Sequence, residues 1–140
     1  MTSSTLLSLL AAGLLIGCGR VNLAPDVEPN VPPVISYRIN IGADAEEVFL
    51  SAVEKYSRSN HYSFWLTRGI PPGTPTNRFI VVGNGMQAIG YNPFDYHEYS
   101  LSFHRNRGQK VSDLAVKEFA DEMIGQIRTI PGVTTEAPPP

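Results

Sequence analysis

The histidines and carboxylates of this chain are the side chains that could bind a metal ion or transfer protons. The densest group lies between residues 95 and 104 and contains Asp95, His97, Glu98 and His104. A catalytic zinc site uses three protein ligands of these types and leaves one position open. The spacing matches no established ligand motif, and the first three residues fall in a predicted loop. We therefore interpret the group as a solvated polar loop and expect neither a metal nor a cofactor.

Nucleophilic catalysis is the second chemistry to consider. A Ser-His-Asp site needs a serine activated by a neighbouring histidine, and no serine of this chain stands in a Gly-x-Ser-x-Gly sequence. Gly83-Asn84-Gly85 lacks the Lys and the following helix of a phosphate-binding loop, so it predicts a hairpin turn. Cys18 is the only cysteine, which excludes a disulfide within the chain. The residues favour a protein that is not an enzyme.

Aromatic residues gather in the segment from 91 to 99. Its four aromatic residues are Tyr91, Phe94, Tyr96 and Tyr99. Tyr, Trp and Arg are enriched at the energetic centres of protein interfaces. We therefore predict that a partner protein contacts the end of the domain that carries Arg68, Phe94, Tyr96 and His97. The alternative is that Tyr91, Phe94 and Tyr99 only complete the hydrophobic core.

The first eighteen residues have the pattern of a secretory signal. An apolar run from Leu6 to Ile16 is shorter than the ~20 residues that a membrane-spanning helix needs and fits the apolar region of a signal peptide. The run ends in Leu15-Ile16-Gly17-Cys18, which resembles the lipobox of bacterial lipoproteins. The resemblance implies that residues 1–17 are removed and that Cys18 is lipidated.

Lipidation of Cys18 would determine where the protein resides. A lipoprotein of this class carries three acyl chains, and two or more chains anchor a protein stably in a membrane. Gly19 follows Cys18, in place of the Asp that marks inner-membrane retention in enteric bacteria. The resemblance therefore implies a protein held in the outer membrane and facing the periplasm.

Composition divides the rest of the chain into three parts. Residues 18–33 contain the lipidated cysteine and four prolines, which is typical of a semi-rigid tether. Residues 34–130 form the single globular domain, and the proline-rich residues 131–140 are predicted to be disordered. With 11 basic and 13 acidic residues, the chain has no strong positive field, so we expect no nucleic-acid partner.

Hydrophobic periodicity predicts the elements of this domain in the order strand, helix, four strands, helix. The strands are expected over residues 35–41, 62–67, 79–82, 86–91 and 99–104, and the helices over residues 44–57 and 112–130. Asp44 and Glu47 form an Asp-x-x-Glu capping box, and Ser112 is a second N-cap. Asn84-Gly85 suits a two-residue hairpin turn.

Both predicted helices have one apolar face, and most of the strands alternate. The simplest packing puts the two helices on one face of a mainly antiparallel sheet of four to five strands, which is a two-layer α+β sandwich. The other face of the sheet is expected to be polar, with Trp65 as its one large apolar residue.

Two functional classes remain. The first is a periplasm-facing lipoprotein that binds another envelope or secreted protein without catalysis, as an assembly factor, inhibitor or immunity-type protein. The alternative is a carrier or sensor of a small apolar or glycan ligand held between the helices and the sheet. Ala52, Ala120 and Gly125 are the small residues that could leave room for such a ligand.

Overall fold

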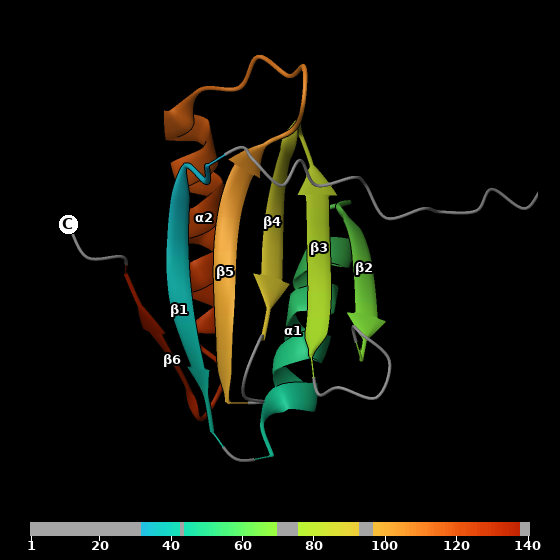
Figure 1. The fold of residues 1–140 in the computed structure, drawn as a ribbon, viewed down its shortest axis with the longest axis vertical. Coiled ribbons are helices and arrows are strands. Elements are labelled where there is room, and N and C mark those ends of the chain that lie inside the picture. The colour runs from blue at the N-terminus through green and yellow to red at the C-terminus, as the bar shows by residue number, and fades with distance from the viewer. Residues whose placement is uncertain (1–31, 43, 70–75, 93–96, 138–140) are drawn as a thin grey trace, which may run out of the picture.

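The structure, a computed structural model, describes residues 32–42, 44–69, 76–92 and 97–137 (Figure 1). These residues form six β-strands and two α-helices. In chain order they are β1 Ile35–Ile41, α1 Glu46–Ser59, β2 Ser63–Arg68, β3 Asn77–Gly83, β4 Met86–Tyr91, β5 Glu98–Arg105, α2 Asp113–Ile127 and β6 Val133–Glu136.

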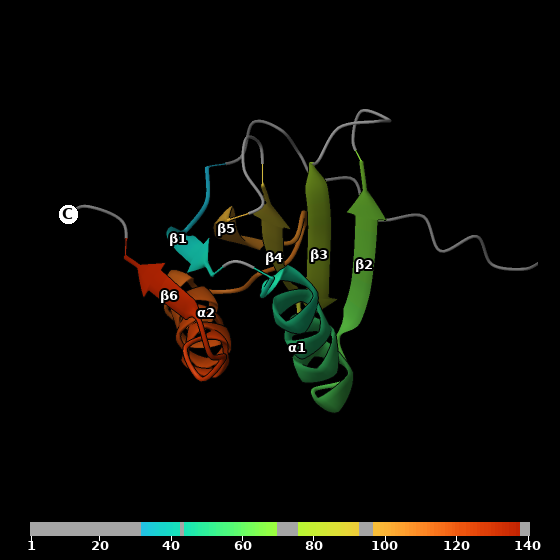
Figure 2. The same cartoon turned by 90° about the horizontal axis from the view of Figure 1, so that it is seen from below.

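The six strands form one sheet with the spatial order β2-β3-β4-β5-β1-β6. Every neighbouring pair is antiparallel. Both helices cover the same face of the sheet, which Figure 2 shows from below. The two-layer α+β sandwich predicted from the sequence is therefore confirmed.

The predicted number of strands was wrong, because the sheet has six strands and not four to five. The additional strand, β6, falls in the segment that was expected to be disordered. It pairs with β1 from Arg38↔Glu136 to Ile41↔Val133, and Val133 is only 7% exposed. The sequence Val133-Thr134-Thr135-Glu136 contains one apolar residue and no apolar–polar alternation, so its pattern does not predict a strand. The free edge of β1 that it joins exists only in the folded sheet.

Two local predictions are confirmed. Asn84 and Gly85 have φ values of 52° and 76° and lie between the paired residues Gly83 and Met86, as a two-residue hairpin turn requires. Ser112 is the N-cap of α2, where its hydroxyl oxygen accepts a hydrogen bond of 3.1 Å from the backbone N–H of Ala115.

The start of α1 differs from the prediction. Asp44 has a φ of 63° and lies outside the helix, and the N-cap is Ala45, which makes no side-chain capping bond. The expected capping box is absent because the N-cap position is occupied by Ala45, whose side chain has no oxygen, and Glu47 accepts hydrogen bonds from Arg68. Glu46 and Glu47 still lie in the first turn of the helix, where negative charge is favourable.

The core between the two layers contains a cluster of three buried rings. The ring centre of Phe49, from α1, lies 5.9 Å from that of Phe79 and 5.2 Å from that of Tyr99. Gly90 lies opposite Phe79 in the β3–β4 register, and a Cβ atom there would come within 2.1 Å of the Phe79 ring. Glycine at this position leaves the space that the Phe79 ring occupies, and the Phe79 and Tyr99 ring centres lie 5.9 Å apart.

The face of the sheet away from the helices is less polar than predicted. The strand register places Trp65, Ile80 and Ile89 side by side across β2, β3 and β4, and Ile80 is only 3% exposed. The prediction that Trp65 is the single large apolar residue there was wrong. That prediction counted only the strands with clear alternation, whereas β3 has apolar residues on both of its faces.

Candidate functional site

Two segments that the sequence singled out connect strands at the same end of the sheet. One joins β2 to β3, and the other joins β4 to β5. Arg68 ends β2 and pairs with Asn77 at the start of β3. His97 precedes β5, and its carbonyl oxygen accepts a hydrogen bond of 2.7 Å from the N–H of Ile41. We call this end, which carries Arg68, Asn77, Asn92 and His97, the loop end.

The loop end brings together two of the four residues predicted to contact a partner. Arg68 and His97 lie there, whereas Phe94 and Tyr96 lie outside the described residues. His97 and Asp44 line a hollow of about 390 Å³ beside the first turn of α1. Contact of these residues with a partner stays a prediction.

Arg68 is held in place by an ion pair with Glu47. Its Nη1 and Nη2 donate to the two carboxylate oxygens at 2.7 Å and 3.0 Å. The side chains are 48% and 70% exposed. The hydrogen bonds from Arg68 lower the pKa of Glu47 below its ordinary value. A guanidinium group has five N–H donors, so the pair orients Arg68 and leaves donors for another acceptor.

A polar network lies beneath the loop end and connects it to α1. Oε1 of Glu46 accepts hydrogen bonds from the Tyr99 hydroxyl at 2.7 Å, Nδ2 of Asn77 at 2.8 Å and Nδ2 of Asn92 at 3.5 Å. Oδ1 of Asn92 also accepts a hydrogen bond from the backbone N–H of Asn77. The two asparagines are 6% and 1% exposed. A buried network with paired donors and acceptors holds its members rigidly.

The Glu46 network fixes the points where both connecting segments leave the sheet. Asn77 is the first residue of β3, and Asn92 follows the last residue of β4. Burial and the bonded Glu46 raise the pKa of Tyr99 above its ordinary value, so its hydroxyl stays protonated and continues to donate. The residue at one end of each segment, Asn77 or Asn92, is therefore held in a fixed position.

The sequence analysis did not find this network. The helix predicted over residues 44–57 includes Glu46 without assigning it a partner, and Asn77 and Asn92 lie outside the predicted strands. The only signal in the sequence is an asparagine at the edge of each segment. Because asparagine is also one of the residues most frequent in turns, that signal does not distinguish a buried network from an ordinary turn.

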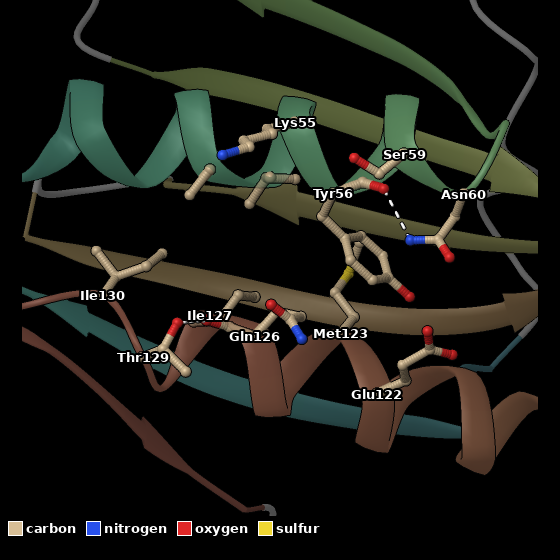
Figure 3. A pocket seen from close by; sticks show the side chains of 12 residues that line it. Lys55, Tyr56, Ser59, Asn60, Glu122, Met123, Gln126, Ile127, Thr129 and Ile130 are labelled. Atoms are coloured by element: carbon tan, nitrogen blue, oxygen red, sulfur yellow. Dashed lines mark hydrogen bonds between the residues drawn. The ribbon is translucent and has the colours of Figure 1, made fainter.

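The second candidate site is a groove between α1 and α2, with a volume of about 430 Å³ (Figure 3). Val53, Met123 and Ile127 line it and are buried. Of the small residues expected to leave room for a ligand, Ala52 lines the groove. Ala120 is fully buried in the core, and Gly125 faces open space.

Tyr56 reaches across this groove from α1 (Figure 3). Its hydroxyl is buried and has no hydrogen-bond partner among the residues that the structure describes. Burial is the largest cause that raises the pKa of Tyr56, followed by the negative charge of Glu122. The hydroxyl is thus protonated and lacks an acceptor within the described ranges.

The histidine and carboxylate group considered for metal binding is not assembled in the described residues. His104 lies on the sheet face away from the helices, where its Nε2 is 2.9 Å from Oγ of Ser102, and His97 lies at the loop end. Asp95 is outside the described residues. Within the described ranges, no cluster of three His, Cys, Asp or Glu side chains could hold a metal ion.

Cys18 and the preceding apolar run lie outside the described residues. Among the helices that the structure does describe, none is long and apolar enough to cross a membrane. In comparisons with known proteins, no family model, curated protein or solved structure matches this chain.

Proposed function

We propose that this chain is a lipid-anchored envelope protein whose domain binds another protein through the loop end, without catalysing a reaction. The observation that carries the proposal is the Glu46 network, which ties the bases of both connecting segments to α1. Binding residues are concentrated on loops that a rigid scaffold positions. A surface that is already ordered also loses less entropy on binding.

The chemistry of the loop end supports a protein partner. Arg68 is oriented by Glu47 and has donors left for a carboxylate or carbonyl oxygen of the partner. We propose that Phe94 and Tyr96 supply the apolar contact area beside it, with His97 at the edge. An arginine flanked by aromatic side chains is a combination enriched at the energetic centres of interfaces.

The anchor in this proposal is Cys18, through the lipobox-like sequence that ends at that residue. Acylation of Cys18 would hold the domain at the outer membrane and make it face the periplasm, with residues 19–33 as the tether. The partner would then be another envelope protein or a secreted protein. After replacement of Cys18 by Ser, the full chain should leave the membrane fraction, and unchanged membrane fractionation would disprove the anchor.

Site-specific photo-crosslinking tests the binding surface directly. A photo-reactive residue is placed at Tyr96 of the full-length protein in its native membranes, with Lys117 as the control position, because Lys117 is exposed on α2. The proposal expects a discrete crosslinked species from position 96 and none from position 117. No product from position 96, or the same products from both positions, would contradict binding at the loop end.

A double variant provides the functional counterpart. Phe94→Ala combined with Tyr96→Ala should abolish recovery of the partner that crosslinks at position 96, while the circular dichroism spectrum stays unchanged. Undiminished recovery of that partner with the folded double variant would exclude these aromatic side chains from the interface.

A carrier or sensor of a small ligand is the second candidate function. The observation that favours it is the groove between α1 and α2, whose volume of about 430 Å³ falls in the ~300–1,000 Å³ range of small-molecule pockets. Native mass spectrometry after mild purification would show a retained small mass if the protein carries a ligand, and a clean mass of the protein alone if it does not.

A further inference from the structure

The groove between α1 and α2 changes in chemistry along its length. Ile127 and Ile130 lie toward one end, and Asn60 and Glu122 lie toward the other, where the Tyr56 hydroxyl also points (Figure 3). One end therefore offers aliphatic surface, and the other offers hydrogen-bonding groups. A molecule that fills the groove would need an apolar part and a polar part in the same order.

The Tyr56 hydroxyl indicates what the polar part must contain. It is buried without a partner among the described residues, although buried polar groups in folded proteins almost always have one. The protonated phenol can donate one hydrogen bond and accept another, so a ligand oxygen that accepts would pair with it. A ligand hydroxyl or ether oxygen placed in the groove would supply it.

The charges around the groove favour a neutral head group. Glu122 lies close enough to Tyr56 for its negative charge to raise the pKa of the phenol, and the same charge disfavours a carboxylate or phosphate bound there. Lys55 is the only cation among the described lining residues, and both Lys55 and Glu122 are exposed to solvent, where screening weakens the effect of either charge. A neutral hydroxyl suits this end best, because it can accept from Tyr56 and donate to Glu122.

We propose that the groove binds a neutral amphipathic ligand of the alkyl glycoside class, with its hydroxylated head group at Tyr56 and its aliphatic tail along Ile127 and Ile130. The inference rests on the second candidate function and specifies its ligand. It is independent of the loop end, which lies at the opposite end of α1 from Asn60.

The binding test uses n-hexyl β-D-glucoside as the probe and the full chain with Cys18→Ser, purified without detergent. Two-dimensional NMR should show saturable shifts of the backbone amides of Lys55, Asn60 and Gln126. Glucose lacks the tail and hexanoate carries an anionic head group, so both should bind about tenfold more weakly or worse, which corresponds to ~1.4 kcal/mol. Absence of saturable binding up to millimolar glucoside, or equal affinity for hexanoate, would overturn the proposal.

Three variants locate the ligand. Tyr56→Phe should weaken glucoside binding about fivefold to tenfold, because it removes one hydrogen bond, while binding of n-hexane, which has no oxygen to pair with the phenol, should stay unchanged. Ala52→Phe fills the groove and should abolish binding of the glucoside and of the second probe alike. Lys117→Ala, on another face of α2, should bind like the parent. Equal glucoside affinity of the folded Tyr56→Phe variant and the parent would disprove the role of the phenol.

Failure of this inference can be told apart from failure of the functions on which it rests. If native mass spectrometry shows a bound molecule of another class and the glucoside does not bind, the ligand assignment is wrong, but the carrier function is supported. If native mass spectrometry shows no bound molecule and the glucoside does not bind, both the ligand assignment and the carrier function are disproved. Crosslinking from Tyr96 is read in the same Tyr56→Phe background and reports on the loop end alone.

Discussion

The hydroxyl of Tyr99 in β5 donates a hydrogen bond of 2.7 Å to Oε1 of Glu46 at the start of α1. The two residues are 53 positions apart and belong to opposite layers of the sandwich. The same oxygen also accepts from Asn77 and Asn92. The Tyr99–Glu46 bond therefore links the helix layer to the sheet and to the bases of both connecting segments.

Removal of this hydroxyl should destabilise the fold measurably. We expect Tyr99→Phe to lower the free energy of unfolding by about 1.5–2 kcal/mol, because it removes a buried hydrogen bond to a charged acceptor. Chemical denaturation measures the change. The matched control is Tyr37→Phe, whose hydroxyl makes a longer bond of 3.4 Å to Asp121 and should matter less. An equal or larger effect in the control would contradict the importance of the Glu46 network.

The ion pair between Arg68 and Glu47 should contribute little to stability. Both side chains are exposed, so Glu47→Gln should lower the free energy of unfolding by about 0.5 kcal/mol or less at neutral pH. Arg68 lowers the pKa of Glu47 below 4.5 in the folded state, so this contribution is present above pH 4.5 and is lost as the pH falls through the lowered pKa. Denaturation of parent and variant at pH 7 and pH 3 tests this. A difference that grows at pH 3 would show the sign to be wrong.

His104 should make the fold less stable in mild acid. Burial lowers the pKa of its imidazole below the ordinary value of 6.5, so the unfolded chain takes up a proton at a higher pH than the folded chain. Stability should therefore fall as the pH drops below about 6.5 and continue to fall until the lowered pKa is passed. Unfolding measured between pH 7.5 and pH 5 should show a shallower slope in His104→Gln. An unchanged slope in the folded His104→Gln variant would contradict this role of His104.

The sixth strand should be part of the cooperative fold. Truncation after Gly132 removes β6 and with it Val133, whose side chain belongs to the hydrophobic core. We expect a loss of about 2–3 kcal/mol, chiefly from burial of this side chain, with further loss from the strand pairing. Truncation after Ala137, which keeps β6 intact, is the control. Equal stability of the two truncated chains in chemical denaturation would show that β6 does not contribute to the fold.

Tyr56→Phe, unlike the truncation, should increase the stability of the fold. The buried hydroxyl lacks a partner among the described residues, so its removal relieves an unpaired polar group while the ring keeps its packing against Tyr62. We expect the free energy of unfolding to rise by about 0.5–1 kcal/mol in the absence of ligand. A loss of more than 1 kcal/mol would mean that the hydroxyl is bonded in the folded protein.

The amino-acid sequence by itself determined the features that a few neighbouring residues encode. The alternation in β1 and β5, the positive φ tolerated by Asn84-Gly85 and the capping hydroxyl of Ser112 each act within one turn or one strand. Two amphipathic helices and a set of alternating strands then leave few ways to bury their apolar faces, so the α+β sandwich followed. The proposed lipid anchor at Cys18 also rests on sequence alone.

Tertiary structure decided the features that depend on which strands and helices become neighbours. β6 forms because β1 offers an unpaired edge, and Glu46 turns from a helix-end charge into an acceptor because Tyr99 and two asparagines converge on it. The groove forms because the C-terminal halves of α1 and α2 lie side by side, which places the Tyr56 phenol between them, without a partner among the described residues. Such contacts join residues tens of positions apart. Local residue patterns carry no information on these contacts, because the strand register and the packing of whole elements decide which distant residues meet.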